Sequence, residues 1–361
     1  FSEAVAGSGG SLSLRADTIT LQSNAGFARA LAQSGAGLSM LAETQTWNGR
    51  VEAGTDPVTG GETEISGAIT ATVQPRFSLT EDRNFAMRAT SPLGKPSSYQ
   101  SDLPLAVETS GSGTIDIGGR VSARQVTLLS DARVGIGAAA RVTGTGPDDA
   151  VVISAGAQFR NEAGPDSVQA SDPAARWLVY IDEFSGLDGD AVGPREFDLY
   201  NRFYEFNLPD SLTDFGGNRI VYGQQPVLTL TGETLSKPYG TAATPGFTLT
   251  GLRPGDESGT AFDTLPSVTS AGSAAAAPVA GSPYSVDVAA VASDQGYALE
   301  FVPGVLTVTP VALRVAADDA NRTYGAANPD FTASFEGFVL DENESALGGS
   351  LAFETDAAET S

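Results

Sequence analysis

The sequence predicts an all-β protein in which a parallel β-helix, a solenoid of short stacked strands, is followed by tandem small β-sandwich or β-grasp-like modules. Three observations lead to this fold class. The chain of 361 residues contains 42 Gly and 20 Pro, an abundance typical of many turns between short strands. Its first part is a series of short alternating apolar segments. Its last part repeats itself with a period of about 85 residues.

The solenoid is predicted over residues 1–165, where the strands are too short to stand alone. Apolar and polar residues alternate there in runs separated by Gly, Ser, Asn and Asp. These runs include Ser11–Leu14, Thr18–Leu21, Ile65–Val73, Ile115–Ile117, Val126–Leu129 and Val151–Ser154. Such strands become stable when many of them stack with their apolar sides in one column. Ile115, Val134 and Ile153 recur 19 residues apart, and we interpret this spacing as one coil.

Two stretches of the solenoid depart from the strand pattern. Residues 26–33 place Phe27 and Leu31 four apart, which predicts a short helix. Residues 75–110 lose the alternation and contain four prolines, so we expect a loop or excursion from the solenoid there.

Residues 166–226 are predicted to form an aromatic-rich cap and connector. Ten aromatic residues fall between Trp177 and Tyr222, whereas the preceding solenoid has few. A solenoid needs a cover for its last coil, and aromatic side chains bury large areas. The alternative interpretation is a sugar-binding aromatic platform. The candidate ligand-binding residues are Phe197, Tyr200, Phe203 and Tyr204.

An internal repeat begins at residue 227. Four short blocks of the segment 227–309 recur in 310–361 with a spacing of 84 to 86 residues. They are Leu228–Leu230 with Leu313–Val315, Lys237–Gly240 with Arg322–Gly325, Pro245–Thr248 with Pro329–Thr332, and Gly251–Leu252 with Gly337–Phe338. The first copy is complete, and the second lacks the equivalent of the closing strand 304–309. We expect either a longer array of such repeats or a strand supplied by another chain.

Charge and composition exclude several classes of function. The net charge of −24 opposes binding to the phosphates of nucleic acids. The chain has no His and no Cys, so Ser-His-Asp catalysis, thiol nucleophiles and zinc sites built on His or thiolate are excluded. We predict no catalytic residues, no cofactor and no enzyme activity. No stretch of about 18 apolar residues could span a bilayer as a helix.

Calcium is the ligand that the acidic loops suit best, because Ca²⁺ prefers oxygen donors. The candidate metal ligands are Asp182, Asp188 and Asp190, two of which alternate around Gly189. The segment lacks the spacing of an EF-hand loop, and a solvated turn is the other interpretation.

Two segments resemble known families. The repeat, with Ala317–Phe338 and the closing Gly296–Pro310, is similar to mostly-beta-glycine-rich (MBG) repeats. Residues 10–26, 155–164 and 175–184 resemble the end of a filamentous-haemagglutinin-like β-helix. These resemblances imply a Gram-negative bacterial exoprotein of the two-partner-secretion type, exported through an outer-membrane partner to the cell surface.

The expected function is structural and adhesive. Such a chain would project from the cell or form a fibre. It would attach to a glycan or protein on a host, neighbouring-cell or matrix surface, and it could also associate with further copies of itself. The alternative is a β-helix carbohydrate-active enzyme or polysaccharide-binding module. That alternative predicts carboxylates that converge in one groove on neighbouring coils.

Overall fold

The computed structural model describes the strand segments 3–6, 11–21, 29–32, 37–47, 50–53, 62–71 and 76–79, and then residues 84–90, 94–262, 264–289 and 292–357. The chain is nearly all β, with 40% strand and 6% helix, and its long sheets are parallel, which confirms the predicted fold class. It divides into two compact units. The first comprises Phe1–Pro226, Arg253–Ala261 and Asp294–Tyr297, and the second comprises the remainder.

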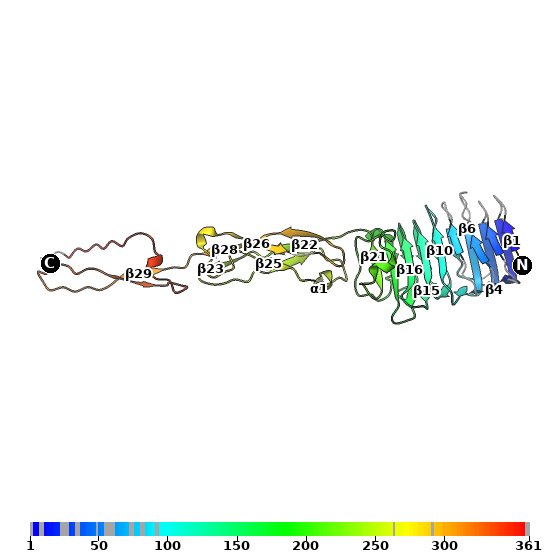
Figure 1. Ribbon diagram of the computed structural model, residues 1–361, viewed down its shortest axis with the longest axis horizontal. Helices are drawn as coiled ribbons and strands as arrows, with labels where there is room; N and C mark the ends of the chain where they lie inside the picture. Colours follow the sequence, from blue (N-terminus) through cyan, green and yellow to red (C-terminus); the bar gives the residue numbers. More distant parts are fainter. Residues whose placement is uncertain are drawn as a thin grey trace. The chain divides into compact units, whose positions relative to one another are not determined.

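The first unit is a parallel β-helix, and its strands lie side by side in Figure 1. One sheet has nine strands, all parallel to their neighbours. Their order is β1 (Glu3–Ala6), β3 (Arg29–Ala32), β5 (Arg50–Ala53), β7 (Arg76–Leu79), β10 (Leu105–Thr109), β13 (Val126–Ser130), β16 (Asp149–Ala155), β19 (Arg176–Ile181) and β21 (Arg219–Tyr222).

The other sheet begins as one column of long strands and then divides in two. β2 (Ser11–Leu21), β4 (Gly37–Trp47) and β6 (Glu62–Ala71) form the single column. β6 pairs with β8 (Asn84–Met87) along its first half and with β9 (Ser98–Gln100) along its second. One column continues from β8 through β11 (Ile115–Ile117), β14 (Arg133–Ile136), β17 (Gln158–Asn161) and β20 (Leu187–Gly189). The second continues from β9 through β12 (Arg120–Ala123), β15 (Arg141–Gly144) and β18 (Val168–Ala170).

Aliphatic side chains stack in register to form the core of the β-helix. Val107, Leu128, Ile153, Val179 and Ile220 occupy equivalent positions on five successive strands of the nine-stranded sheet, and all have 0% exposure. Full burial of such a side chain stabilises a fold by about 1.5–3 kcal/mol. The alternating strands are therefore held by apolar columns that run along the stack.

The predicted coil spacing is correct for one step and wrong for the next. Ile115 on β11 pairs directly with Val134 on β14. The next residue in that column is Phe159, 25 residues further on, because the intervening coil is longer. Ile153 lies in the nine-stranded sheet, opposite Leu128.

The prediction of a helix over residues 26–33 is wrong where the structure describes them, because Arg29–Ala32 form the strand β3. Residues 26–28 and 33 lie outside the described residues. The expected excursion over 75–110 is also wrong, because β7 to β10 all pair within the solenoid. Pro104 precedes β10, and Pro96 takes part in an isolated bridge beside β9. Prolines at these positions cost no hydrogen bond inside a strand.

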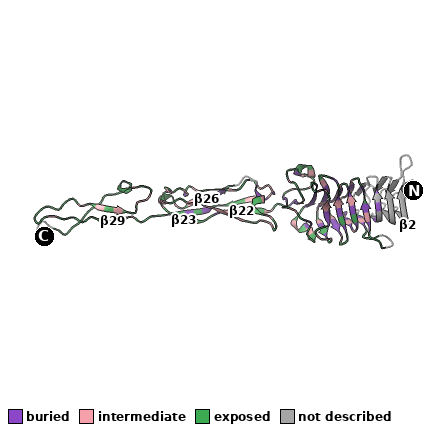
Figure 2. Cartoon of the chain, turned by 90° about the horizontal axis from the view of Figure 1, so that it is seen from below, coloured by how far each residue is buried: buried purple, intermediate pink, exposed green. Residues whose placement is uncertain are grey.

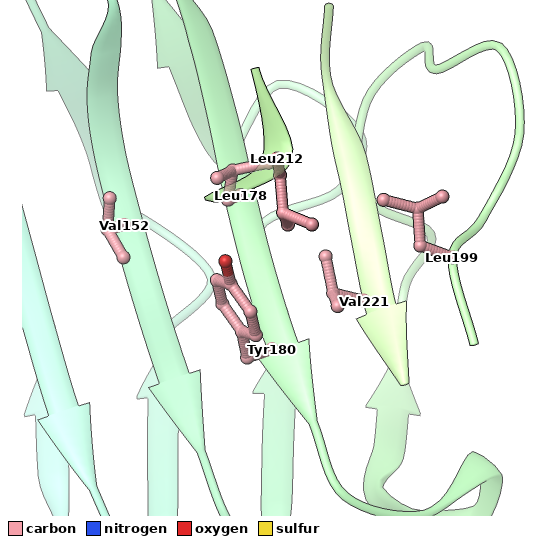
Figure 3. Packing of buried hydrophobic residues seen from close by; sticks show 6 residues of the cluster. All are labelled: Val152, Leu178, Tyr180, Leu199, Leu212 and Val221. Atoms are coloured by element: carbon pink, nitrogen blue, oxygen red, sulfur yellow. The ribbon is translucent and has the colours of Figure 1, made fainter. Parts of the chain in front are cut away.

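The parallel sheets extend past residue 165, the boundary expected from sequence, and reach Tyr222. Part of the aromatic-rich segment packs on the last strands, on the face opposite the column of Ile153, Val179 and Ile220. Its buried cluster joins residues of β16, β19 and β21 to residues of the segment between β20 and β21 (Figure 3). The members are Val152, Leu178, Tyr180, Leu199, Leu212 and Val221, with Phe197, Tyr204 and Phe215 packed against them.

Two short 3₁₀ helices, η1 (Phe184–Gly186) and η2 (Pro209–Leu212), and α1 (Ser258–Ala261) also belong to this unit.

The second unit contains a complete module and part of another. In the complete module, one sheet has the order β24 (Phe247–Thr250), β22 (Val227–Gly232), β27 (Ala298–Val302). The other sheet has the order β23 (Leu235–Pro238), β28 (Gly304–Thr309), β26 (Tyr284–Ala289), β25 (Ser267–Thr269). Buried residues alternate with more exposed ones along β22, β26 and β28, as in a small two-sheet β module. Figure 2 colours the chain by this burial. η3 (Val279–Gly281) precedes β26.

The partial module repeats one antiparallel strand pair of the complete one. β29 (Arg314–Ala317) pairs with β30 (Ala333–Glu336) so that Val315 faces Phe335, as Leu230 faces Leu249 in the complete module. The short 3₁₀ helix η4 (Glu344–Ala346) follows. Within the described residues, no helix is long and apolar enough to cross a membrane.

Candidate functional site

A groove of about 490 Å³ lies along the ends of four successive strands of the β-helix. The register of β10, β13, β16 and β19 places Ser110, Asp131, Gly156 and Asp182 at equivalent positions, one residue beyond each strand. A Cβ atom on Gly156 would lie 2.5 Å from the carbonyl oxygen of Asp131. The floor between the two aspartates therefore has no room for a side chain.

One wall of the groove is formed by Phe203, Tyr204 and Glu205. The Tyr204 ring meets Tyr180 edge-on, with 5.3 Å between the ring centroids. The Phe203 ring lies against Gly223, where a Cβ atom would be 2.3 Å from the ring. These contacts hold the wall in place before any ligand binds.

The neighbouring Arg202 anchors the same loop. Its Nη1 donates hydrogen bonds to the carbonyl oxygens of Tyr200 (2.9 Å) and Gln295 (3.1 Å), and its Nη2 donates to that of Asp294 (3.0 Å). Its guanidinium also lies 5.1 Å from the centroid of the Phe215 ring. A loop fixed by several hydrogen bonds loses little conformational entropy on binding.

Four carboxylates line the groove, and no Lys or Arg does. They are Glu108, Asp131, Asp182 and Glu205. Within the described residues none of the four forms an ion pair; Asp131 accepts a hydrogen bond from the backbone N–H of Gly111 at 2.9 Å. Burial raises the pKa of Asp182, and Glu205, Asp131 and Glu183 raise it further. Burial and Glu108 likewise raise the pKa of Tyr204. The groove has an unneutralised negative potential that attracts cationic groups and hydrogen-bond donors.

The structure does not bring the three predicted calcium ligands together. Asp182 lies in the groove, whereas Asp188 lies on β20 of the other sheet and Asp190 follows it. Asp188 accepts a hydrogen bond from Nε2 of Gln158 (3.3 Å) and is 3.8 Å from Nε of Arg160. In the described part of the chain, no group of three or more acidic side chains is close enough to hold a metal ion.

The four predicted ligand-binding aromatics divide into two pairs. Phe203 and Tyr204 line the groove. Tyr200 is 1% exposed and donates a hydrogen bond to Oδ2 of Asp256 (2.5 Å), so it is a packing residue. The guanidinium of Arg219 lies 4.2 Å from the centroid of the Phe197 ring, which also packs against the cluster in Figure 3. Sequence analysis did not select Glu108, Asp131 and Glu205. An alignment of successive coils would place Asp131 in register with Asp182, whereas Glu205 belongs to the segment between β20 and β21.

A Tyr-Gly turn recurs in both copies of the repeat. Gly240 and Gly325 both adopt positive φ, 88° and 81°. A basic side chain closes each turn: Nζ of Lys237 donates to the carbonyl oxygen of Thr241 (2.7 Å), and Nη1 of Arg322 donates to that of Ala326 (2.6 Å). Glycine is required at such positive φ values.

The fold thus defines a parallel β-helix protein that carries small repeated β modules. Residues 313–360 match the family described as MBG domain (YGX type), and Tyr324-Gly325 lies within this match. The match supports a repeat-containing surface protein. No curated protein and no solved structure matches the chain.

Proposed function

We propose that this chain is a structural and adhesive segment of a large secreted bacterial surface protein. The observation that carries the proposal is the MBG match at residues 313–360, together with the equivalent strand pairing of the two repeats. Stacked coils and repeated modules are built from nearest-neighbour contacts, an arrangement suited to a projecting or fibre-forming chain. The protein would be extracellular, at the bacterial cell surface.

The proposed partners follow from this role. They are a host, neighbouring-cell or matrix surface, recognised through glycan or protein, and further copies of the chain in a fibre. The net charge of −24 supports a surface that stays soluble and avoids uncontrolled association of strand edges.

Adhesion can be measured with beads coated with the full chain. We expect these beads to adhere to cells or extracellular matrix more than beads coated with an unrelated protein of similar negative charge. Equal adherence of the two sets of beads would contradict the adhesive role.

The secretion route is a separate proposal. Filamentous-haemagglutinin-like exoproteins of Gram-negative bacteria are exported through an outer-membrane partner. The sequence pattern of this β-helix resembles theirs. The reading frame that encodes this chain should contain an upstream secretion domain, and export should require the gene for the partner. Export that is unaffected by deletion of that gene would exclude two-partner secretion.

The alternative function, a carbohydrate-active enzyme or polysaccharide-binding module, is favoured by one observation. Carboxylates from neighbouring coils line a single groove beside two aromatic rings. An enzyme would release new reducing ends from a polysaccharide, whereas we expect the purified chain to release none. Release that is abolished by Asp182→Asn would overturn the non-enzymatic proposal.

A further inference from the structure

We propose that the groove walled by Phe203 and Tyr204 binds an oligosaccharide that carries free amino groups. This inference deepens the proposed function, because it names the chemistry of a surface to which the chain would adhere. Acidic residues alone would describe a solvated surface, so the argument begins with the cavity and its aromatic wall.

The aromatic wall offers a flat apolar surface beside polar groups. Phe203 is 40% exposed, although the close approach of its ring to Gly223 holds it in place. Tyr204 is half-buried and fixed against Tyr180. Ligand sites combine such apolar surfaces with a few placed polar groups. A pyranose ring has the matching character, with an apolar face for the aromatic rings and hydroxyl groups at its edge.

The spacing of the acidic floor suits an extended ligand. Asp131 and Asp182 are two coils apart, which corresponds to about 9.6 Å at the usual separation of neighbouring strands. Gly156 keeps the floor between them free of a side chain. This span is comparable with the length of a disaccharide, so the first and third sugars of an extended chain could each meet one carboxylate.

The charge of the groove selects among sugars. Its four carboxylates have no cationic lining residue to balance them. Burial raises the pKa of Asp182, and repulsion from Glu205 and Asp131 raises it further. A ligand with ammonium groups relieves this repulsion and forms charge-assisted hydrogen bonds. A polymer of uronic acids is repelled instead.

Two other ligand classes fit less well. Peptides add to a sheet through a free strand edge, but β10, β13 and β16 are each paired on both sides. A single metal ion needs several oxygen ligands at about 2.3–2.6 Å. The described residues contain no such acidic group.

Calorimetric titration of the full chain tests the proposal, with a tetrasaccharide of glucosamine as the probe. We expect it to bind at least about tenfold more tightly than the N-acetylated tetrasaccharide, because acetylation removes the charge. A tetrasaccharide of galacturonic acid should not bind. Absence of binding by the glucosamine probe, or equally tight binding of tetralysine, would overturn the inference.

Variants locate the site. Asp182→Asn, Glu205→Gln and Phe203→Ala should each weaken binding of the glucosamine tetrasaccharide by about fivefold or more. Asp188→Asn is the matched control, since Asp188 is an exposed aspartate outside the groove, and it should bind as the unaltered chain does. Circular dichroism spectra and urea midpoints establish that each variant is folded. Unchanged binding in all three folded groove variants would place the sugar elsewhere and overturn the inference.

The bead experiment separates this inference from the proposed function. The first outcome concerns beads coated with the Asp182→Asn, Glu205→Gln double variant. If they still adhere fully, the groove is not the part of the chain that contacts the cell or matrix, and the adhesive role stands. If beads coated with the unaltered chain fail to adhere although the chain binds the sugar in solution, only the adhesive role is contradicted.

Discussion

Asn161 shows how one buried polar side chain can hold a turn of the β-helix. It is 0% exposed at the end of β17, and its Nδ2 is within 3.0–3.1 Å of the carbonyl oxygens of Gly164, Asp190 and Ala191. Its Oδ1 accepts from the backbone N–H of Ala163 at 3.1 Å. One buried side chain thus makes hydrogen bonds to backbone groups of its own turn and of the next coil.

Removal of this side chain should be costly. We expect Asn161→Ala to lower the free energy of unfolding by about 2–4 kcal/mol, because a fully buried side chain and its hydrogen bonds to two turns are lost. Urea denaturation monitored by circular dichroism measures the change. Asn328→Ala removes a single exposed hydrogen bond and should cost less than about 0.5 kcal/mol. Equal effects of the two substitutions would contradict this account of Asn161.

Asp182 should make stability depend on pH. Its pKa is raised in the folded chain, so the folded state binds this proton more readily than the unfolded state does. The contribution of Asp182 to stability therefore falls as the pH rises from the ordinary carboxyl range through the raised pKa. We expect Asp182→Asn to raise the urea midpoint at pH 7, with the gain lost when the carboxyl is protonated in both states. Asp188→Asn, which removes a carboxylate near Arg160, should give no gain, and a lowered midpoint for Asp182→Asn at pH 7 would contradict the repulsion.

At the scale of elements, the two repeats place equivalent strands in different surroundings. Leu230 on β22 is 0% exposed, because β22 lies between β24 and β27. Val315 on β29, the equivalent residue, is 47% exposed, and in the described chain β29 pairs only with β30. The same sequence position is a core position in one module and a surface position in the other.

This difference predicts unequal costs of substitution. Leu230→Ala should destabilise the complete module by about 2–5 kcal/mol, because it leaves a cavity in a packed core. Val315→Ala should change stability by less than about 0.5 kcal/mol, since little apolar area is lost. Thermal unfolding of each variant measures the two effects. A large effect of Val315→Ala would show that a further strand covers β29 in solution.

At the scale of the whole molecule, charge governs solubility. The net charge is −24 at pH 7 and the isoelectric point is about 4.1. Mutual repulsion keeps neighbouring chains apart at neutral pH and vanishes near the isoelectric point. We expect light scattering to report dispersed protein at pH 7 and association as the pH approaches 4. Protein that stays dispersed through pH 4 would show that charge is not what keeps the chains apart.

The all-β class, the stacking of short strands and the equivalence of the two repeats could be predicted from the amino-acid sequence. These features are local or periodic: alternation of apolar residues selects strands, and Gly and Pro mark turns. The Tyr-Gly turn, with a basic residue ahead of it, could be recognised in both copies for the same reason. The resemblance to MBG repeats at residues 313–360 also needed only the sequence.

The order in which residues stack from coil to coil is known from the folded chain and not from the sequence pattern. Coil lengths vary, so Phe159 and not Ile153 follows Val134 in its column. The same register places Asp131 and Asp182 in one groove and Asp188 on another sheet. The folded segment between β20 and β21 places Phe203 and Tyr204 along that groove, and Tyr204 also packs against the buried cluster. Proximity between coils arises from packing and strand register, and residues far apart in the chain carry no local signal of either.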